Sequence, residues 1–351
     1  MKLNNIYPQT VTNRILIRFA MFCLLFLHAL TGVNAQDIHF SQFQSSPLNL
    51  NPALTGFYNG DYRFIANHRR QWKSVTVPYR TFSGSFDMPV NFFPESKQRY
   101  SLGLLINNDR AGDSELGLTQ VGISAGAIRA LGRDSIHFLS GGIQFSYVRR
   151  SINYSDLTFD EQFTGDGFDP NTGNSENFSG DNQGYFDFGA GLTYLIRVND
   201  RFKAGAGISL QHINRPNDSF FDEGAKMFPR LQTDLKADFA IATRFDLIPA
   251  LIFMNQGSFR EITGGTSVRF RLSELPGRNY ALYLGSWLRA KDAFIASAGF
   301  DYNNLNVGVS YDFNTSDLDR ASNGKGGYEL SLIYIIRKVK PLSIKPPCPL
   351  Y

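Results

Sequence analysis

Residues 185–196 have the sequence YFDFGAGLTYLI, and residues 202–211 have the sequence FKAGAGISLQ. In both stretches every second side chain is apolar, and polar residues or glycines occupy most of the positions between them. Successive side chains of a β-strand point to opposite faces of the sheet. Each stretch therefore predicts a strand with one apolar face and one polar or glycine-rich face.

The same period-two pattern recurs along the chain about fourteen times. Many of these runs span about ten residues or more, which suits a tilted strand that crosses a membrane. No stretch of the chain after the first 35 residues is apolar for long enough to predict a membrane-spanning helix. The expected strands start near residues 62, 79, 100, 116, 136, 184, 201, 234, 249, 259, 278, 292, 304 and 327.

The connections between these strands differ in length on the two sides. With both termini placed on the periplasmic side, the longest connections all fall on the other side: residues 150–183, 213–230 and 314–326. Most periplasmic connections are tight, namely Leu131–Ser135, Asn199–Asp200, the region near Leu247, and Asn303–Asn304. Bacterial outer-membrane barrels show this asymmetry, whereas a secreted β-sandwich does not require it. The sequence predicts an all-β fold: a transmembrane antiparallel β-barrel of about 14 strands.

The first 35 residues predict a secretory signal peptide that is cleaved after Ala35. Basic residues precede an apolar run from Phe19 to Leu30, and Val33-Asn34-Ala35 resembles an A-x-A cleavage site. The segment carries three basic residues and no acidic ones, so its removal lowers the formal net charge from +4 to +1. That charge argues against nucleic-acid binding. Only Cys348 remains, so we expect no internal disulfide.

We expect four parts of the chain. Residues 1–35 are the signal peptide, residues 36–60 plug the lumen or lie in the periplasm, residues 61–338 form the barrel, and residues 339–351 are a Pro-rich tail. Aromatic residues near strand ends are expected to form girdles at the membrane interface: Tyr302, Tyr311, Phe313, Tyr328 and Tyr334. Four glycines on the inward face leave space for residues 37–60: Gly189, Gly191, Gly205 and Gly207. The polar wall residues Lys203 and Gln211 are expected to bind the backbone of this segment.

The N-terminal residues resemble the signature of the PorP/SprF family. The matching positions are Asp37, His39-Phe40-Ser41-Gln42, Pro47-Leu48, Leu50-Asn51-Pro52-Ala53, Gly56, Tyr62-Arg63, Arg69 and Gln71-Trp72. Ser85-Phe86-Asp87 and the run from Gly327 to Leu332 are similar to the family's second and last strands. Ile38 departs from the pattern, because the family usually has proline there, and Arg70 stands where Asn or Asp is common.

The resemblance implies an outer-membrane component of the type IX secretion system. Such a protein supports export or surface attachment of specific cargo proteins, such as adhesins for gliding motility. The implied partners are secreted cargo proteins with a type IX sorting domain, other secretion-system components and outer-membrane lipid. It implies no cofactor and no nucleic acid.

A second function stays open. Asn51-Pro52-Ala53 is also similar to the N-terminal hatch of FadL-like fatty-acid transporters, which are fourteen-stranded barrels too. The alternative is therefore a FadL-like outer-membrane channel for hydrophobic small molecules. The wider signature with Arg69, Gln71 and Trp72 favours secretion, whereas an apolar lumen pocket large enough for an acyl chain would favour the channel.

Residues 151–183 form an acidic loop with no Lys or Arg. Its acids could contact a basic cargo surface, bind Ca²⁺, or only keep the loop solvated. Residues 166–171 lack the ligand spacing of an EF-hand loop, so we expect no metal site. The candidate partner-binding residues are Asp156, Asp160, Glu161, Asp166 and Asp169.

Apparent catalytic signals do not fit their context. Gly122-Ile-Ser124-Ala-Gly126 has the letters of a nucleophile elbow, but it lies inside an alternating strand, not at a strand-to-helix turn. The histidines after the signal peptide are scattered, with none at metal-ligand spacing. His68 to Trp72 end a strand, so we expect them to anchor the barrel at the membrane interface. We expect no enzyme activity.

Overall fold

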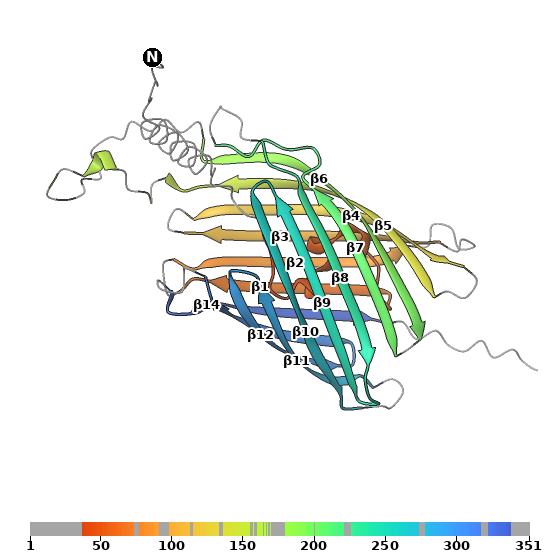
Figure 1. The fold of residues 1–351 in the computed structure, drawn as a ribbon. Coiled ribbons are helices and arrows are strands. Elements are labelled where there is room, and N and C mark those ends of the chain that lie inside the picture. Colours follow the sequence, from red (N-terminus) through yellow and green to blue (C-terminus); the bar gives the residue numbers. More distant parts are fainter. Residues whose placement is uncertain are drawn as a thin grey trace, which may run out of the picture.

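Fourteen antiparallel strands close into one barrel in the computed structural model (Figure 1). Each strand pairs with its neighbours in the sequence, and β14 pairs with β1, so the sheet has no free edge. The structure describes residues 37–73, 77–90, 98–112, 115–132, 136–154, 157, 160–163, 165, 167, 169, 180–199, 201–220, 226–273, 278–316 and 322–337. The predicted architecture and strand number are confirmed.

The strands are long, as the period-two runs predicted. They are β1(Tyr62–Gln71), β2(Tyr79–Val90), β3(Gln98–Ala111), β4(Leu116–Leu131), β5(His137–Ser151), β6(Asn182–Asn199), β7(Phe202–Gln211), β8(Arg230–Ala240), β9(Phe245–Gln256), β10(Phe259–Arg271), β11(Tyr280–Arg289), β12(Ala293–Tyr302), β13(Leu305–Asn314) and β14(Lys325–Ile336). Short helical turns are η1(Phe43–Ser45), α2(Pro47–Leu50), η2(Pro52–Leu54) and η4(Asp160–Gln162). Among the described residues, no helix has the length and apolar character needed to cross a membrane.

Two of the expected strand starts were wrong by four residues. β8 begins at Arg230 and not at residue 234, and β9 begins at Phe245 and not at Pro249. Proline cannot donate to a strand ladder, so it is usual at the first position of a strand. Here Pro249 lies inside β9 opposite Thr266, and the pairing of β8 with β9 leaves out Ile248 and Pro249. The tight turn expected near Leu247 therefore lies at residues 241–244.

The two faces of each strand differ as predicted. On β6, Phe186, Phe188 and Leu192 are exposed, whereas Asp187 and Thr193 are buried. The outward side chains form the apolar surface that faces lipid, and the inward ones face the lumen. All five expected girdle aromatics, Tyr302, Tyr311, Phe313, Tyr328 and Tyr334, are exposed.

The two ends of the barrel carry different connections. Residues 152–181, 212–229 and 315–324 join strands at one end, which we call the long-loop end. Residues 200–201, 241–244 and 303–304 join strands at the other, the short-turn end. By the usual topology of outer-membrane barrels, the long-loop end is extracellular.

Residues 37–60, the lumen segment, lie inside the ring of strands (Figure 1). Asp37 contacts His212, which follows β7 at the long-loop end. The backbone N–H of Asp61 donates to the carbonyl of Ile336 at the short-turn end. The segment thus runs the length of the lumen. Asp37, the first described residue, therefore lies near the long-loop end, whereas the start of the mature chain was expected on the short-turn side. Strand periodicity carries no information on the direction of the residues before β1.

Candidate functional site

The middle of the lumen segment is held by a short capped turn. Asn51 is fully buried and donates from Nδ2 to the carbonyl oxygens of Leu192 and Ile208, at 3.2 and 3.3 Å. Its Oδ1 accepts from the backbone N–H of Ala53 at 2.9 Å, which caps η2. Pro52 suits the first position of η2, since that position needs no N–H donor. Asn51-Pro52-Ala53 therefore ties the segment to β6 and β7.

Backbone carbonyls of the lumen segment find donors on the barrel wall. Ser140 Oγ donates to the carbonyl of Ala53 at 2.6 Å, and Ser209 Oγ donates to that of Leu50 at 3.0 Å. The predicted wall partner Gln211 donates to the carbonyl of Asn49 at 3.2 Å. Because buried carbonyls need partners, these contacts replace the water that the segment loses in the lumen.

Glycines on the wall allow this close approach. A Cβ on Gly191 would lie 2.0 Å from Asn51 Oδ1, and one on Gly207 would lie 2.9 Å from Asn51 Nδ2. Of the four inward glycines in the prediction, these two make room for the lumen segment. A Cβ on Gly189 or Gly205 would meet only groups of the wall.

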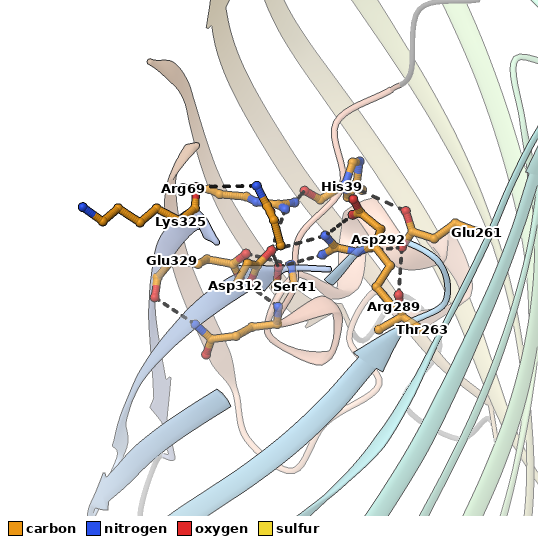
Figure 2. A network of polar contacts seen from close by, with 12 residues as sticks. His39, Ser41, Arg69, Glu261, Thr263, Arg289, Asp292, Asp312, Lys325 and Glu329 are labelled. Carbon is orange, nitrogen blue, oxygen red and sulfur yellow. Dashed lines mark hydrogen bonds and ion pairs between the residues drawn. The ribbon is translucent and has the colours of Figure 1, made fainter. Parts of the chain in front are cut away.

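A network of buried charges fastens the lumen segment near the long-loop end (Figure 2). Glu329 of β14 accepts from the backbone N–H groups of Ser41 and Gln42, at 2.7 and 2.9 Å. The Ser41 hydroxyl donates to Asp312 of β13 at 2.7 Å and accepts from Arg289 of β11 at 2.8 Å. Three strands, β11, β13 and β14, therefore converge on two residues of the segment.

Arg69 of β1 completes this network. It donates to the carbonyl of His39 at 2.5 Å and to Asp312 at 3.0 Å (Figure 2). Arg69 is only 2% exposed, and Glu329 only 1%. Removing one partner of a buried ion pair costs about 3–5 kcal/mol, because the other charge stays buried and unpaired. The charges of the network therefore fix the position of the segment.

A second cluster holds the first described residue. His212 lies between two carboxylates: its Nε2 is 2.5 Å from Asp37 Oδ2, and its Nδ1 is 2.9 Å from Asp187 Oδ1. Arg230 is 3.4 Å from Asp37 as well. Burial favours the neutral ring, but the flanking carboxylates outweigh it and raise the pKa of His212 to about 9. Burial also opposes the charge of Asp37, yet His212 and Arg230 hold its pKa well below the usual range.

At the short-turn end a third anchor fixes the exit of the segment. Arg63 binds the fully buried Asp87 of β2 through two hydrogen bonds, at 2.8 and 2.7 Å. Asp87 also accepts from the backbone N–H of Gly56 at 2.7 Å, and Arg63 donates to the carbonyl of Leu54 at 3.0 Å. The guanidinium lies over the ring of Tyr58, 4.4 Å from its centroid. This bidentate pair is geometrically specific.

The signature residues therefore act mainly in the docking of the lumen segment. Phe40, Ser41, Asn51 and Ala53 are buried, as is Pro52, and Gln42 is half-buried; all belong to the segment. Arg69 was expected to anchor the barrel at the membrane interface, and this was wrong. Its side chain points inward, since Asn67 and Arg69 share the buried face of β1.

Two other signature residues lie at the end of β1. Gln71 is half-buried and falls on the same strand face as Arg69. Trp72 directly follows β1 in the left-handed region, with φ +54°, and its ring meets Tyr79 edge-on with centroids 4.7 Å apart. Its position at the strand end fits the expected interfacial role.

The expected partner-binding acids lie in the connection between β5 and β6, at the long-loop end. Asp160 and Glu161 belong to η4, and Glu161 and Asp169 are exposed. The backbone N–H of Asp169 donates to the carbonyl of Gln162 at 2.9 Å. Asp156 and Asp166 lie outside the described residues.

Other expectations concerned chemistry. Gly122, Ser124 and Gly126 lie inside β4, and Ser124 accepts a hydrogen bond from Thr55. Within the described ranges no three His, Cys, Asp or Glu side chains are grouped so that they could hold a metal ion. Sequence spacing did not reveal that His39 and His212 enter the buried networks, because their partners lie on strands far away in the chain.

Stability should depend on pH with opposite signs for the two histidines. Burial, with the nearby cations Arg69 and Arg289, lowers the pKa of His39 to about 4, although Glu261 opposes the shift. A lowered histidine pKa contributes stability above the unfolded value near 6.5, which is lost as the pH falls towards 4. The raised pKa of His212 contributes stability below 6.5, which is lost as the pH rises through about 9.

We therefore expect the free energy of unfolding to fall by about 2 kcal/mol between pH 6.5 and 5 through His39 alone. Urea unfolding of the barrel in detergent measures this. The variant His39→Gln should have a smaller acid loss, and His212→Gln should have a smaller alkaline loss. Equal pH profiles for all three proteins would contradict the assignment.

The fold of the barrel is similar to that of a transporter of known structure. The Ralstonia pickettii toluene transporter TbuX matches with a TM-score of 0.51 and 8% identity, over 84% of this chain and 94% of that chain. A Pseudomonas aeruginosa FadL homologue matches with a TM-score of 0.46 and 10% identity, over 81% and 92%. At such low identity, the first likeness shows the fold alone. Among curated proteins, none matches.

The family is established by sequence. The model of the type IX secretion system membrane protein PorP/SprF matches residues 32–334, which is most of the chain. The match spans both the lumen segment and nearly all of the barrel. Its fold and family support a location in the outer membrane and a role in secretion or transport. The chain belongs to the PorP/SprF family of type IX secretion system membrane proteins.

Proposed function

We propose that this barrel is a component of the type IX secretion system that retains specific cargo proteins, such as adhesins, at the cell surface. In this proposal the signal peptide is removed after Ala35, residues 36–60 plug the lumen, and residues 61–338 form the barrel. The tail over residues 339–351 lies outside the described part of the chain. The cargo carries a type IX sorting domain, and other components of the system deliver it.

The observation that carries the proposal is the fixation of the lumen segment at three levels. The clusters around Asp312, Asn51 and Asp87 bind it near the long-loop end, in the middle and near the short-turn end. A barrel filled in this way is suited to hold a partner on its outer loops. It is poorly suited to pass a folded protein through its lumen.

The acidic loop supports the same function. The candidate contacts Asp156, Asp160, Glu161, Asp166 and Asp169 belong to the connection after β5, on the side that carries the long loops. A loop with clustered negative charge attracts a basic cargo surface. Charged groups at the rim of an interface tune encounter and specificity, and salt screens them.

One observation favours the alternative, a channel for hydrophobic small molecules. A cavity of about 600 Å³ lies beside the lumen segment, and part of its lining is apolar. However, its lining also includes Arg99, Arg197, Lys203 and Lys236, and the network of Figure 2 ties the segment to the wall nearer the long-loop end. We therefore rank the channel second.

The acidic loop is tested by neutralising four of its carboxylates. The variant with Asp156, Asp160, Asp166 and Asp169 all replaced by Asn should release cargo from the cell surface into the medium at low salt, where the native loop retains it. High salt should narrow the difference, because it screens the charges of the native loop. Immunoblots of cell-surface and medium fractions measure this. A control with Asn171, Asn174 and Asn177 replaced by Ser keeps the charge of the loop and should retain cargo. Retention by the Asn variant at every ionic strength would refute the contact.

A further inference from the structure

The cavity of about 600 Å³ has the properties of a binding site for a small ligand. It lies between the lumen segment and the inner wall of β4 to β8. Its apolar lining includes Leu54 and Phe57 from the segment, and Ile128, Phe138 and Leu195 from the wall. Its volume is within the usual range for small-molecule sites.

Cations gather on one side of this cavity. Arg197 near the end of β6 lies directly opposite Lys203 near the start of β7, and Lys236 lies on the next strand, opposite Gly205. All three side chains line the cavity. Like charges directly opposite in a sheet repel and destabilise it. The stability of the barrel therefore does not explain why these three cations lie together.

The carboxylates that line the cavity, Asp234 and Asp238, compensate these cations only in part. Within the described part of the chain, no carboxylate forms an ion pair with Arg197, Lys203 or Lys236. Asp238 is opposite Lys203 in the sheet, but Arg269 engages its carboxylate at 3.1 Å. Arg63, which also lines the cavity, is paired with Asp87. When these two ion pairs are set aside, four cations line the cavity, namely Arg99, Arg197, Lys203 and Lys236. They share the cavity with one carboxylate, that of Asp234.

We propose that this cavity binds an amphipathic anion with an apolar body and one carboxylate or phosphate head group. The head group lies between Arg197 and Lys203, where it relieves their repulsion and accepts charge-assisted hydrogen bonds. The apolar body packs against Phe138 and Leu195. Arg197 already lies over the ring of Phe138, 5.7 Å from its centroid, so the charged and apolar parts of the site adjoin.

The cationic side of the site lies near the short-turn end. Arg197 and Lys203 flank the turn at residues 200–201, whereas the buried network around Ser41 lies nearer the long-loop end. The head group of the ligand therefore lies near the short-turn end. This function is separate from cargo retention by the long loops, and it does not require transport across the membrane.

Competition against a fluorescent fatty acid tests the proposal. The full barrel is purified in dodecyl maltoside and loaded with cis-parinaric acid, and oleate, lysophosphatidylglycerol and methyl oleate are used as competitors. We expect oleate or lysophosphatidylglycerol to displace the probe, and the uncharged methyl oleate to bind at least about tenfold more weakly. If oleate competes more strongly, the ligand is a free fatty acid. If lysophosphatidylglycerol competes more strongly, the ligand is a lipid with a phosphate head group.

Variants separate the site from non-specific binding. Replacing Arg197 and Lys203 by Gln should weaken the binding of the anion about tenfold or more. The control Arg201→Gln removes a neighbouring exposed cation that does not line the cavity, and it should bind as the native protein does. Leu195→Trp fills the cavity without a change of charge and should abolish binding. Heat-dependent migration on SDS gels confirms that each variant is assembled.

Two results would overturn the proposal. The first is equal competition by methyl oleate and oleate, which would mean that the head group is not recognised. The second is unchanged binding of the probe by both the Gln variant and Leu195→Trp, which would place the ligand elsewhere.

Discussion

Deletion of residues 38–56 is expected to raise the conductance of the barrel in planar bilayers severalfold. The deleted residues include the network around Ser41, the Asn51 turn and the Gly56 contact, so the lumen loses its main occupant. Polar side chains of the wall that now bind the segment would face water instead. Ion current through single barrels measures the change.

The control for this experiment is a barrel that lacks residues 339–351 but keeps the lumen segment. It should conduct as the native protein does. Equal conductance of the native protein and the variant without residues 38–56 would show that the segment does not limit the current.

A single methyl group at Gly142 is expected to displace the same segment. A Cβ there would lie 2.2 Å from the carbonyl oxygen of Pro52 and 2.6 Å from the backbone N of Ala53. Both atoms belong to the backbone of η2, which cannot move aside as a flexible side chain does. Overpacking of this kind costs about 1–3 kcal/mol. We expect Gly142→Ala to raise conductance and to make the segment accessible to protease.

The neighbouring position provides a matched control. A Cβ on Gly141 would meet only Leu192 Cδ2, at 3.5 Å, which is an ordinary contact. Gly141→Ala should therefore behave as the native barrel. If both alanine variants behave alike, the close packing of η2 against β5 does not hold the segment in place.

Much of the barrel could be predicted from the sequence, because local alternation reveals which side chains face lipid. Phe186 and Leu192 alternate with Asp187 and Thr193 in the chain, and the structure separates them in the same way. Errors arose where one residue type has two possible contexts. Proline usually stands at the first position of a strand. Pro249, however, lies inside β9 at a gap in the ladder.

The contacts of the lumen segment could not be predicted in this way. Alternation places Arg69 and Glu329 on inward faces, but it does not say which residues they meet. Ser41 and Glu329 are 288 positions apart in the chain, and only the closure of the barrel brings them together. The resemblance to the PorP/SprF family marked Ser41, Asn51 and Arg69 as important. Their physical role became visible only in the fold.

The docking contacts also give the family signature a physical meaning. Ser41 and Asn51 bind the wall through hydrogen bonds, and Gly56 binds Asp87 through its backbone N–H. Asn51 fits because Gly191 and Gly207 have no side chain. Substitution of these residues is therefore expected to affect the lumen more than the outer surface.

Cargo display in a strain that lacks this protein tests whether the barrel retains cargo at the cell surface. The surface and medium fractions of the null strain, the native strain and a complemented strain are compared by quantitative mass spectrometry. We expect one or a few secreted proteins with a type IX sorting domain to leave the surface of the null strain, while growth on long-chain fatty acids is unchanged. Normal display of every surface protein, together with loss of growth on long-chain fatty acids, would contradict this expectation and support the channel.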